Sequence, residues 1–162
     1  MAKNNYRRLN TEELASLEKE FIDFLVVNGI TAPDWEQMKE ENPENSDQMV
    51  ELFSEVVFEG IFRKTKFLKI STAKFIYAYQ CLADKIVLVG MESEDDSADL
   101  TKMDFNNVSA IKNASISLLM TDKKYAKKRE YELFEMTQNG CEISDGQLFK
   151  SLSLIYMENR NG

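Results

Sequence analysis

The stretch TKFLKISTAKFIYAYQCLADKIVLVGME, residues 65–92, decides the fold. Apolar and polar side chains alternate along it with a period of two, and β-branched and aromatic residues are frequent, which is typical of strands. Short turns at Ser71-Thr72 and Ala83-Asp84 divide it, so the pattern predicts strands over residues 65–71, 74–82 and 85–92. Connections this short join antiparallel neighbours, and we therefore expect a meander.

The segment before these strands has helical periodicity. Helical spacing is kept over more than three turns by Met49, Val50, Phe53, Val56, Val57, Gly60 and Ile61. A second apolar side comes from Leu52, Phe58 and Phe62. A helix that is apolar on two sides is usually buried between layers, so we predict a central helix over about residues 46–64.

Two further helices are predicted before residue 43. Thr11 is a suitable N-cap for a first helix with an apolar stripe, which ends at Asn28-Gly29. The stripe consists of Leu14, Leu17, Phe21, Phe24 and Leu25. A second, short helix begins at Thr31, carries Pro33 in its first turn and ends where Asn42-Pro43 interrupts it.

The pattern is weaker after the acidic loop of residues 92–99. Residues 101–113 are compatible with a helix capped by Thr101 and Asp104, and residues 115–120 with a fourth strand. Whether residues 101–120 form helix, strand or both stays open. Residues 122–139 are predicted to be helical, and Ser144 with Gln147 to form the capping box of a last helix. Together these elements predict an α+β fold, with an antiparallel meander of three or four strands packed against several helices.

Length and composition indicate one globular domain. The chain has 162 residues, of which 43% are apolar and 30% charged, and we expect residues 1–162 to fold together with flexible ends at 1–9 and 158–162. The net charge of −8 argues against binding to nucleic acid or to an anionic membrane surface. No run approaches the roughly 18–20 apolar residues of a membrane span, and we expect neither a signal peptide nor a membrane anchor.

The chain contains no histidine. This excludes a Ser-His-Asp or Cys-His relay and any metal site that needs an imidazole ligand. The two cysteines, Cys81 and Cys141, are far apart and lack a CxxC partner, so we expect free, inert thiols in a reducing cytoplasm. We predict no catalytic residue and no cofactor.

Five runs resemble an uncharacterised family of small bacterial domains that occurs mostly in Bacteroidetes. They are FIDFLVVNGI (21–30), DWEQMK (34–39), ELFSEVVFEGIFRK (51–64), KFLKI (66–70) and GCEISDGQLFKSL (140–152). The resemblance covers most of residues 6–157. It implies a cytoplasmic bacterial protein with a single domain, and it assigns no functional residue.

Two groups of carboxylates are candidate metal ligands. The first is a row with a spacing of four on the central helix, namely Asp47, Glu51, Glu55 and Glu59. The second is the acidic loop around Asp95, Asp96 and Asp99, which lacks the spacing, the glycine and the closing glutamate of an EF-hand. Solvated surface charge explains both groups, so we predict that no metal is bound.

Three aromatic residues are candidates for binding. Trp35, the only tryptophan, lies on a short helix between two breakers, and tryptophan is frequent in binding hot spots. Tyr77 and Tyr79 share one face of the second strand with Phe75, where they either pack under a helix or form a platform. A basic run at residues 123–129 precedes two helices, but the second helix has the apolar stripe of a core element rather than a recognition helix.

These observations favour a non-enzymatic cytoplasmic domain that binds another protein, and self-association of the chain is a further option. The alternative is a small-ligand-binding domain or weak enzyme with a pocket between sheet and helices, lined by Tyr77, Tyr79 and carboxylates. The third hypothesis is nucleic-acid binding through residues 123–129, against which the net charge argues.

Overall fold

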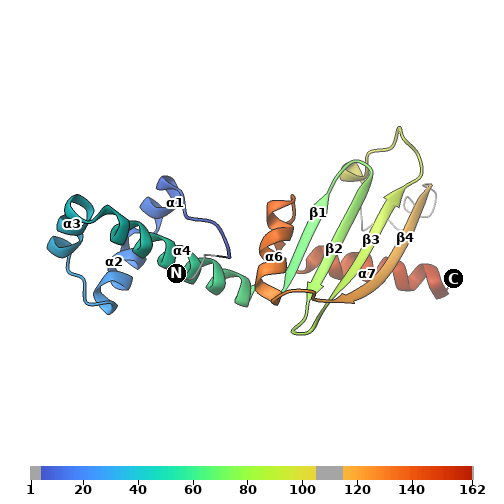
Figure 1. Cartoon of the computed structure of the whole chain (residues 1–162). Coiled ribbons are helices and arrows are strands. Elements are labelled where there is room, and N and C mark those ends of the chain that lie inside the picture. Colours follow the sequence, from blue (N-terminus) through green and yellow to red (C-terminus); the bar gives the residue numbers. More distant parts are fainter. Residues whose placement is uncertain (1–4, 105–114, 162) are drawn as a thin grey trace. The chain divides into compact units, whose positions relative to one another are not determined.

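The first part of the chain is helical, and the second is an antiparallel sheet with helices on both faces (Figure 1). The computed structural model describes residues 5–104 and 115–161. The chain divides at the end of α4 into two compact units, which we call the N-terminal unit, residues 1–63, and the C-terminal unit, residues 64–162. The expectation of one domain over residues 1–162 stays a prediction.

The described part of the N-terminal unit begins with α1 (Thr11–Ser16) and α2 (Glu18–Val27), where one helix was predicted. Leu17 separates them, with φ −109° and ψ 24°. The predicted N-cap at Thr11 is wrong by one residue, because the Asn10 side chain accepts from the backbone N–H of Glu13 at 2.8 Å. Glu13 in turn accepts from the Asn10 N–H, which completes a capping box.

The next two helices begin with clear local signals. Thr31 caps α3 (Ala32–Glu41) as predicted, through a reciprocal pair of hydrogen bonds with Asp34. α4 (Pro43–Lys64) ends where the central helix was predicted to end, but it begins at Pro43, before the predicted start near residue 46. Proline is tolerated in a first helical turn because the N–H groups there have no partner within the helix.

Aromatic side chains form much of the core of the N-terminal unit. The Phe53 ring lies 5.0 Å from that of Phe21 and 5.3 Å from that of Phe24. Tyr6 stacks on Phe58, with 5.8 Å between ring centroids. Tyr6 and Leu9 are buried, although no core residue was predicted before Thr11. The predicted flexibility of residues 1–9 is not tested.

The C-terminal unit confirms the predicted α+β fold and meander. The strands are β1 (Phe67–Ser71), β2 (Phe75–Cys81), β3 (Lys85–Ser93), β4 (Ile116–Lys124) and β5 (Glu142–Ser144), in the order β4-β3-β2-β1-β5. All neighbouring pairs are antiparallel, with Leu68 opposite Tyr79 and Ala78 opposite Val89. β5 was not predicted, because a three-residue strand has too few positions to display an alternation.

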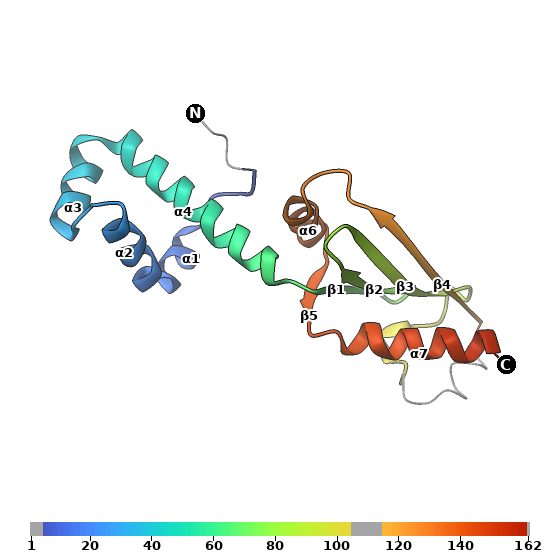
Figure 2. The same ribbon diagram turned by 90° about the horizontal axis from the view of Figure 1, so that it is seen from below.

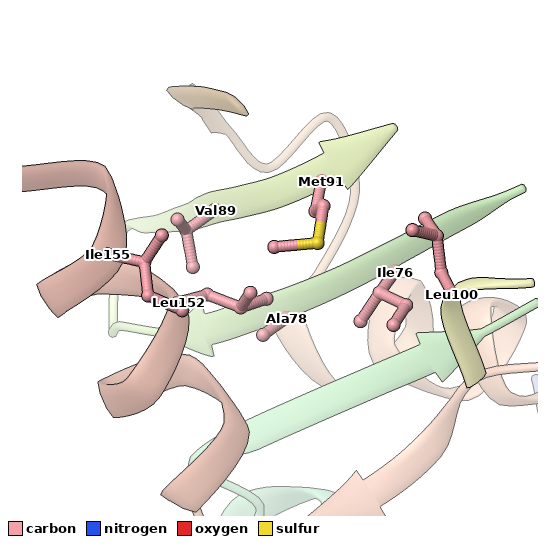
Figure 3. Packing of buried hydrophobic residues seen from close by; sticks show 7 residues of the cluster. All are labelled: Ile76, Ala78, Val89, Met91, Leu100, Leu152 and Ile155. Atoms are coloured by element: carbon pink, nitrogen blue, oxygen red, sulfur yellow. The ribbon is translucent and has the colours of Figure 1, made fainter. Parts of the chain in front are cut away.

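The main core of this unit lies between the sheet and α7 (Gln147–Asn161). Leu152 and Ile155 of α7 point toward Ala78 and Val89, and Leu100 of the short 3-10 helix η1 (Leu100–Lys102) lies beside Ile76 (Figure 3). α6 (Arg129–Gln138) lies on the opposite face of the sheet (Figure 2). Strand alternation therefore gives a buried α7 face and an α6 face, to which Tyr77 and Tyr79 belong.

The prediction of a helix over residues 122–139 is wrong in its first part. β4 continues to Lys124, because Asp122, Lys123 and Lys124 pair with residues of β3, and α6 begins only at Arg129. Lysines favour a helix in isolation, but here pairing with the neighbouring strand decides the structure.

Two predicted caps are also wrong. Ser144 is the last residue of β5 and accepts from the Gly146 N–H, while Asp145 accepts from the first N–H of α7, that of Gln147. Asp99 caps η1 by accepting from the Thr101 N–H at 3.0 Å, so Thr101 is not a cap. The rest of the predicted helix over 101–113 lies, from residue 105 on, outside the described residues.

Candidate functional site

An apolar groove lies between α2 and α3 in the N-terminal unit. It has a volume of about 340 Å³, and its apolar lining consists of Phe21, Ile22, Leu25, Val26, Ile30, Ala32 and Trp35. Glu18, Glu36 and Lys39 provide charged groups along it. We call it the α2–α3 groove.

The local sequence explains why the two helices meet here. Gly29 follows α2 with a φ of +77°, the left-handed conformation that glycine adopts without strain. The Ile30 N–H donates to the Leu25 carbonyl and the Gly29 N–H to that of Val26, each at 2.9 Å, which is a Schellman motif. Thr31 then caps α3 directly, so only residues 28–31 connect the two helices.

The groove has a buried floor and exposed walls. Leu25 is only 4% exposed, and the Phe21 ring meets the Trp35 ring edge-on at 5.2 Å. Ile22 is 49% exposed and Val26 is 62% exposed, four residues apart on the same side of α2. The groove therefore presents large apolar side chains to solvent next to the only tryptophan.

Charge is divided unevenly between the two units. Residues 1–63 contain 6 Lys and Arg against 14 Asp and Glu, whereas residues 64–162 contain 14 of each kind. The whole net charge of −8 therefore belongs to the N-terminal unit, which carries the groove. Lys39 of the groove lies 3.0 Å from Glu36 and neutralises one of the two carboxylates that line the groove, so the acidic excess comes mainly from the rest of the unit.

The other two candidate residues lie in the C-terminal unit, on the α6 face of the sheet. The Tyr77 hydroxyl donates to the Glu92 carboxylate, and this hydrogen bond, together with burial, raises the pKa of Tyr77 to about 12. The ring of Tyr77 stacks on Phe75 at 4.7 Å. Burial raises the pKa of Tyr79 to about 12 as well.

A smaller hollow lies on the same face, beside α6. It measures about 130 Å³ and is lined in part by Ile86, Lys123, Tyr125, Glu132 and Met136. Neither Tyr77 nor Tyr79 lines it. The structure thus brings a tyrosine and a carboxylate together at Tyr77 and Glu92, but the two predicted tyrosines do not line this hollow.

Carboxylates of the row on α4 form hydrogen bonds and ion pairs with nearby side chains. Glu59 accepts from the Tyr6 hydroxyl and lies 3.4 Å from Arg63, and Asp47 lies 3.3 Å from Arg8. Within the described residues, no three Asp, Glu or Cys side chains gather in a group that could hold a metal ion. The absence of a bound metal stays a prediction.

Asp95 in the acidic loop accepts hydrogen bonds from another residue of the same loop. Asp95 accepts from the backbone N–H and hydroxyl of Ser97, and these hydrogen bonds lower the pKa of Asp95. Asp96 lies 3.4 Å from Lys74. These contacts are those of solvent-exposed turns.

The basic run of residues 123–129 does not form one helical stripe. Arg129 donates to the backbone carbonyls of Thr65, Cys81 and Leu82, so its guanidinium stabilises the packing of these segments. Lys127 lies 2.5 Å from Glu135. Nucleic-acid binding by this run stays an untested hypothesis.

Trp35 was predicted as a candidate binding residue, but Ile22 and Val26 on the groove walls were not. The stripe assigned to the first helix leaves out Ile22 and Val26, and both lie on the exposed side of that stripe. Two large apolar residues that lie four positions apart, outside the core stripe of a helix, could have indicated an exposed apolar surface there.

Comparison with protein families gives the identity of the chain at the level of a family. Residues 1–157 match a family of unknown function, DUF6495, and the chain belongs to this family. Neither the curated proteins nor the solved structures contain a significant match. Over the described residues, no helix combines the length and apolar character needed to cross a membrane.

Proposed function

We propose that this protein is a non-enzymatic protein-interaction domain, and that its α2–α3 groove binds a basic amphipathic helix of a partner protein. The observation that carries the proposal is the exposure of Ile22 and Val26 beside Trp35, in a unit with a net charge of −8. Large exposed apolar side chains in a concave site are typical of protein-binding surfaces.

The dimensions of the groove favour a helical ligand. α2 and α3 each have ten residues and are therefore about 15 Å long, which matches two to three turns of a docked helix. Such a helix would place apolar residues at positions i, i+3, i+4 and i+7 on the floor formed by Phe21, Leu25 and Trp35.

The exposed walls argue against a small molecule as the main ligand. Small-ligand pockets enclose most of the ligand surface. Here Val26 is more than half exposed, so a small molecule would leave the wall in contact with water. A longer helix covers both walls at once.

The charge of the N-terminal unit specifies the polar face of the partner. A helix with Lys and Arg beside its apolar stripe would meet Glu18 at the groove and would be attracted by the surrounding acidic surface of the unit. An acidic helix of the same shape would be repelled.

Trp35 provides a direct assay, because it is the only tryptophan and lines the groove. The probe is a synthetic helical peptide with leucines at i, i+3, i+4 and i+7 and lysines elsewhere, titrated into the intact chain. We expect a saturable change in tryptophan emission. A scrambled peptide of the same composition should bind about tenfold more weakly, because its leucines no longer share one face.

Two variants on the same helix complete the test. Val26→Glu places a charge in the groove and should weaken binding of the leucine–lysine peptide about tenfold. Val27→Glu makes the same change at a side chain that is 85% exposed and does not line the groove, so binding should change less than about twofold. Equal effects of the two variants, or equal binding of the scrambled peptide, would contradict the proposal.

A bacterial, mostly Bacteroidetes, origin and a cytoplasmic location are part of this proposal. The free thiols of Cys81 and Cys141 support a reducing compartment.

A further inference from the structure

We infer that the C-terminal unit binds a second copy of itself through the edge strand β4, so that two sheets join into one across a twofold axis at Met120. β4 has nine residues and lies at the end of the strand order, with β3 on one side. Among the described residues, no strand pairs with its other side. A long edge strand is a template for pairing with another chain.

The hydrogen-bonding phase of β4 identifies the residues that face the open edge. The Glu94 N–H donates to the Ser115 carbonyl at 2.8 Å, in the register that continues through β3 and β4. Bonded and non-bonded positions alternate in an antiparallel pair, so Ser117, Leu119, Thr121 and Lys123 bond to β3. The N–H and C=O groups that point outward belong to Ile116, Leu118, Met120, Asp122 and Lys124.

This phase is compatible with a twofold axis at Met120. Met120 is an outward-facing residue, so two copies can exchange its N–H and C=O across the axis. The same register places Leu118 opposite Asp122 of the second copy and Ile116 opposite Lys124, and all of these are outward-facing residues. Every edge-facing backbone group of one strand therefore meets one of the other.

Charge complementarity favours this register. It places Ser117 opposite Lys123 of the second copy, both on the α6 face. The Ser117 hydroxyl donates to the Glu94 carboxylate at 2.6 Å, so this carboxylate lies beside the side chain that the incoming lysine would face. Opposite residues of neighbouring strands have Cβ atoms about 5 Å apart, a distance that a lysine side chain spans. By symmetry the Lys123–Glu94 pair forms twice.

The division of charge explains why the chain would associate through this unit. The C-terminal unit has 14 basic and 14 acidic residues, so two copies meet without net repulsion. Contact between two N-terminal units would bring together two surfaces with a charge of −8 each.

The first test is the mass of the intact chain by analytical ultracentrifugation over about a hundredfold range of concentration. We expect a reversible dimer with twice the chain mass of 18.7 kDa. Lys123→Glu and Glu94→Lys should each raise the dissociation constant about tenfold, because each replaces two attractions with two repulsions. The double variant Lys123→Glu/Glu94→Lys should restore dimerisation, since the pair is re-formed with opposite signs.

The second test addresses the backbone. Asp122→Pro removes an outward N–H that β3 does not use, so the unit should keep its circular dichroism spectrum while the dimer is lost. Asp122→Asn changes the same charge but keeps the N–H, and its dimer should persist. A wild-type chain that stays monomeric at every concentration would overturn the inference. So would folded single variants whose double variant fails to regain the dimer.

Discussion

The hydroxyl of Ser54 holds the N-terminal segment onto α4, and its removal gives the most direct test of the N-terminal core. Ser54 is fully buried. Its Oγ accepts from the Leu9 N–H at 2.9 Å and donates to the Val50 carbonyl at 2.7 Å. Ser54→Ala leaves the Leu9 N–H buried without a partner, while the Val50 carbonyl keeps its bond within the helix.

The expected change in the free energy of unfolding on Ser54→Ala is the difference between two opposing effects. An unsatisfied buried donor costs about 1–3 kcal/mol, and alanine in place of serine within a helix returns about 0.5 kcal/mol. We therefore expect the free energy of unfolding to fall by about 1.5 kcal/mol. Urea unfolding followed by the emission of Trp35 measures it for the unit that contains the change.

Ser46→Ala is the matched control. Ser46 is also buried on α4, but its hydroxyl only donates to the Pro43 carbonyl at 2.8 Å and accepts from no described backbone N–H. Its loss leaves no donor unpaired, so stability should change by less than about 0.5 kcal/mol. Equal effects of the two substitutions, together with unchanged hydrogen exchange at Leu9, would refute the reasoning.

Three further predictions concern the core, a helix cap and pH. Leu152→Ala removes a fully buried side chain from the core under α7 and should lower the free energy of unfolding by about 3 kcal/mol, measured by circular dichroism. Asp145→Ala should cost about 1 kcal/mol and Ser144→Ala much less, because the aspartate accepts the first N–H of α7; equal costs would contradict this. The Arg7 hydrogen bond lowers the pKa of Glu13 to about 2 from 4.5, so the ionised Glu13 stabilises the fold above pH 4.5, and this stabilisation is lost as the pH falls toward 2. In Glu13→Gln, the free energy of unfolding should therefore lack this loss when it is measured from about pH 5 down to about pH 2.

The elements that were predicted correctly are those whose signal is local. The alternation over residues 65–92 requires only that one face of each strand be buried, and α7 buries it at Ile76, Ala78 and Val89. Thr31 caps α3 through residues three positions away. In contrast, the strand conformation of Lys123 and Lys124 depends on β3, which precedes them by more than thirty residues, and no local pattern indicates that pairing.

The candidate site was predictable in part for the same reason. Trp35 was singled out because a lone tryptophan on a short helix is conspicuous in any sequence. The groove around it depends on how α2 and α3 pack after Gly29, which sequence spacing alone does not specify. Tyr77 and Tyr79 were correctly placed on one strand face, but their separation from Trp35 into another unit required the structure.

The two units differ in charge, so the net charge of the whole chain does not describe how each unit interacts with polyanions. A net charge of −8 argues against polyanion binding by the N-terminal unit, but the C-terminal unit is neutral and carries the basic run. Local contacts disfavour polyanion binding there instead, since Arg129 donates to backbone carbonyls and Lys127 is paired with Glu135. The same division separates the two proposed interactions by their response to salt. A basic helix in the α2–α3 groove is attracted by a whole acidic unit and should be released steeply as salt rises, whereas a β4 dimer held by backbone hydrogen bonds and two ion pairs should weaken only modestly.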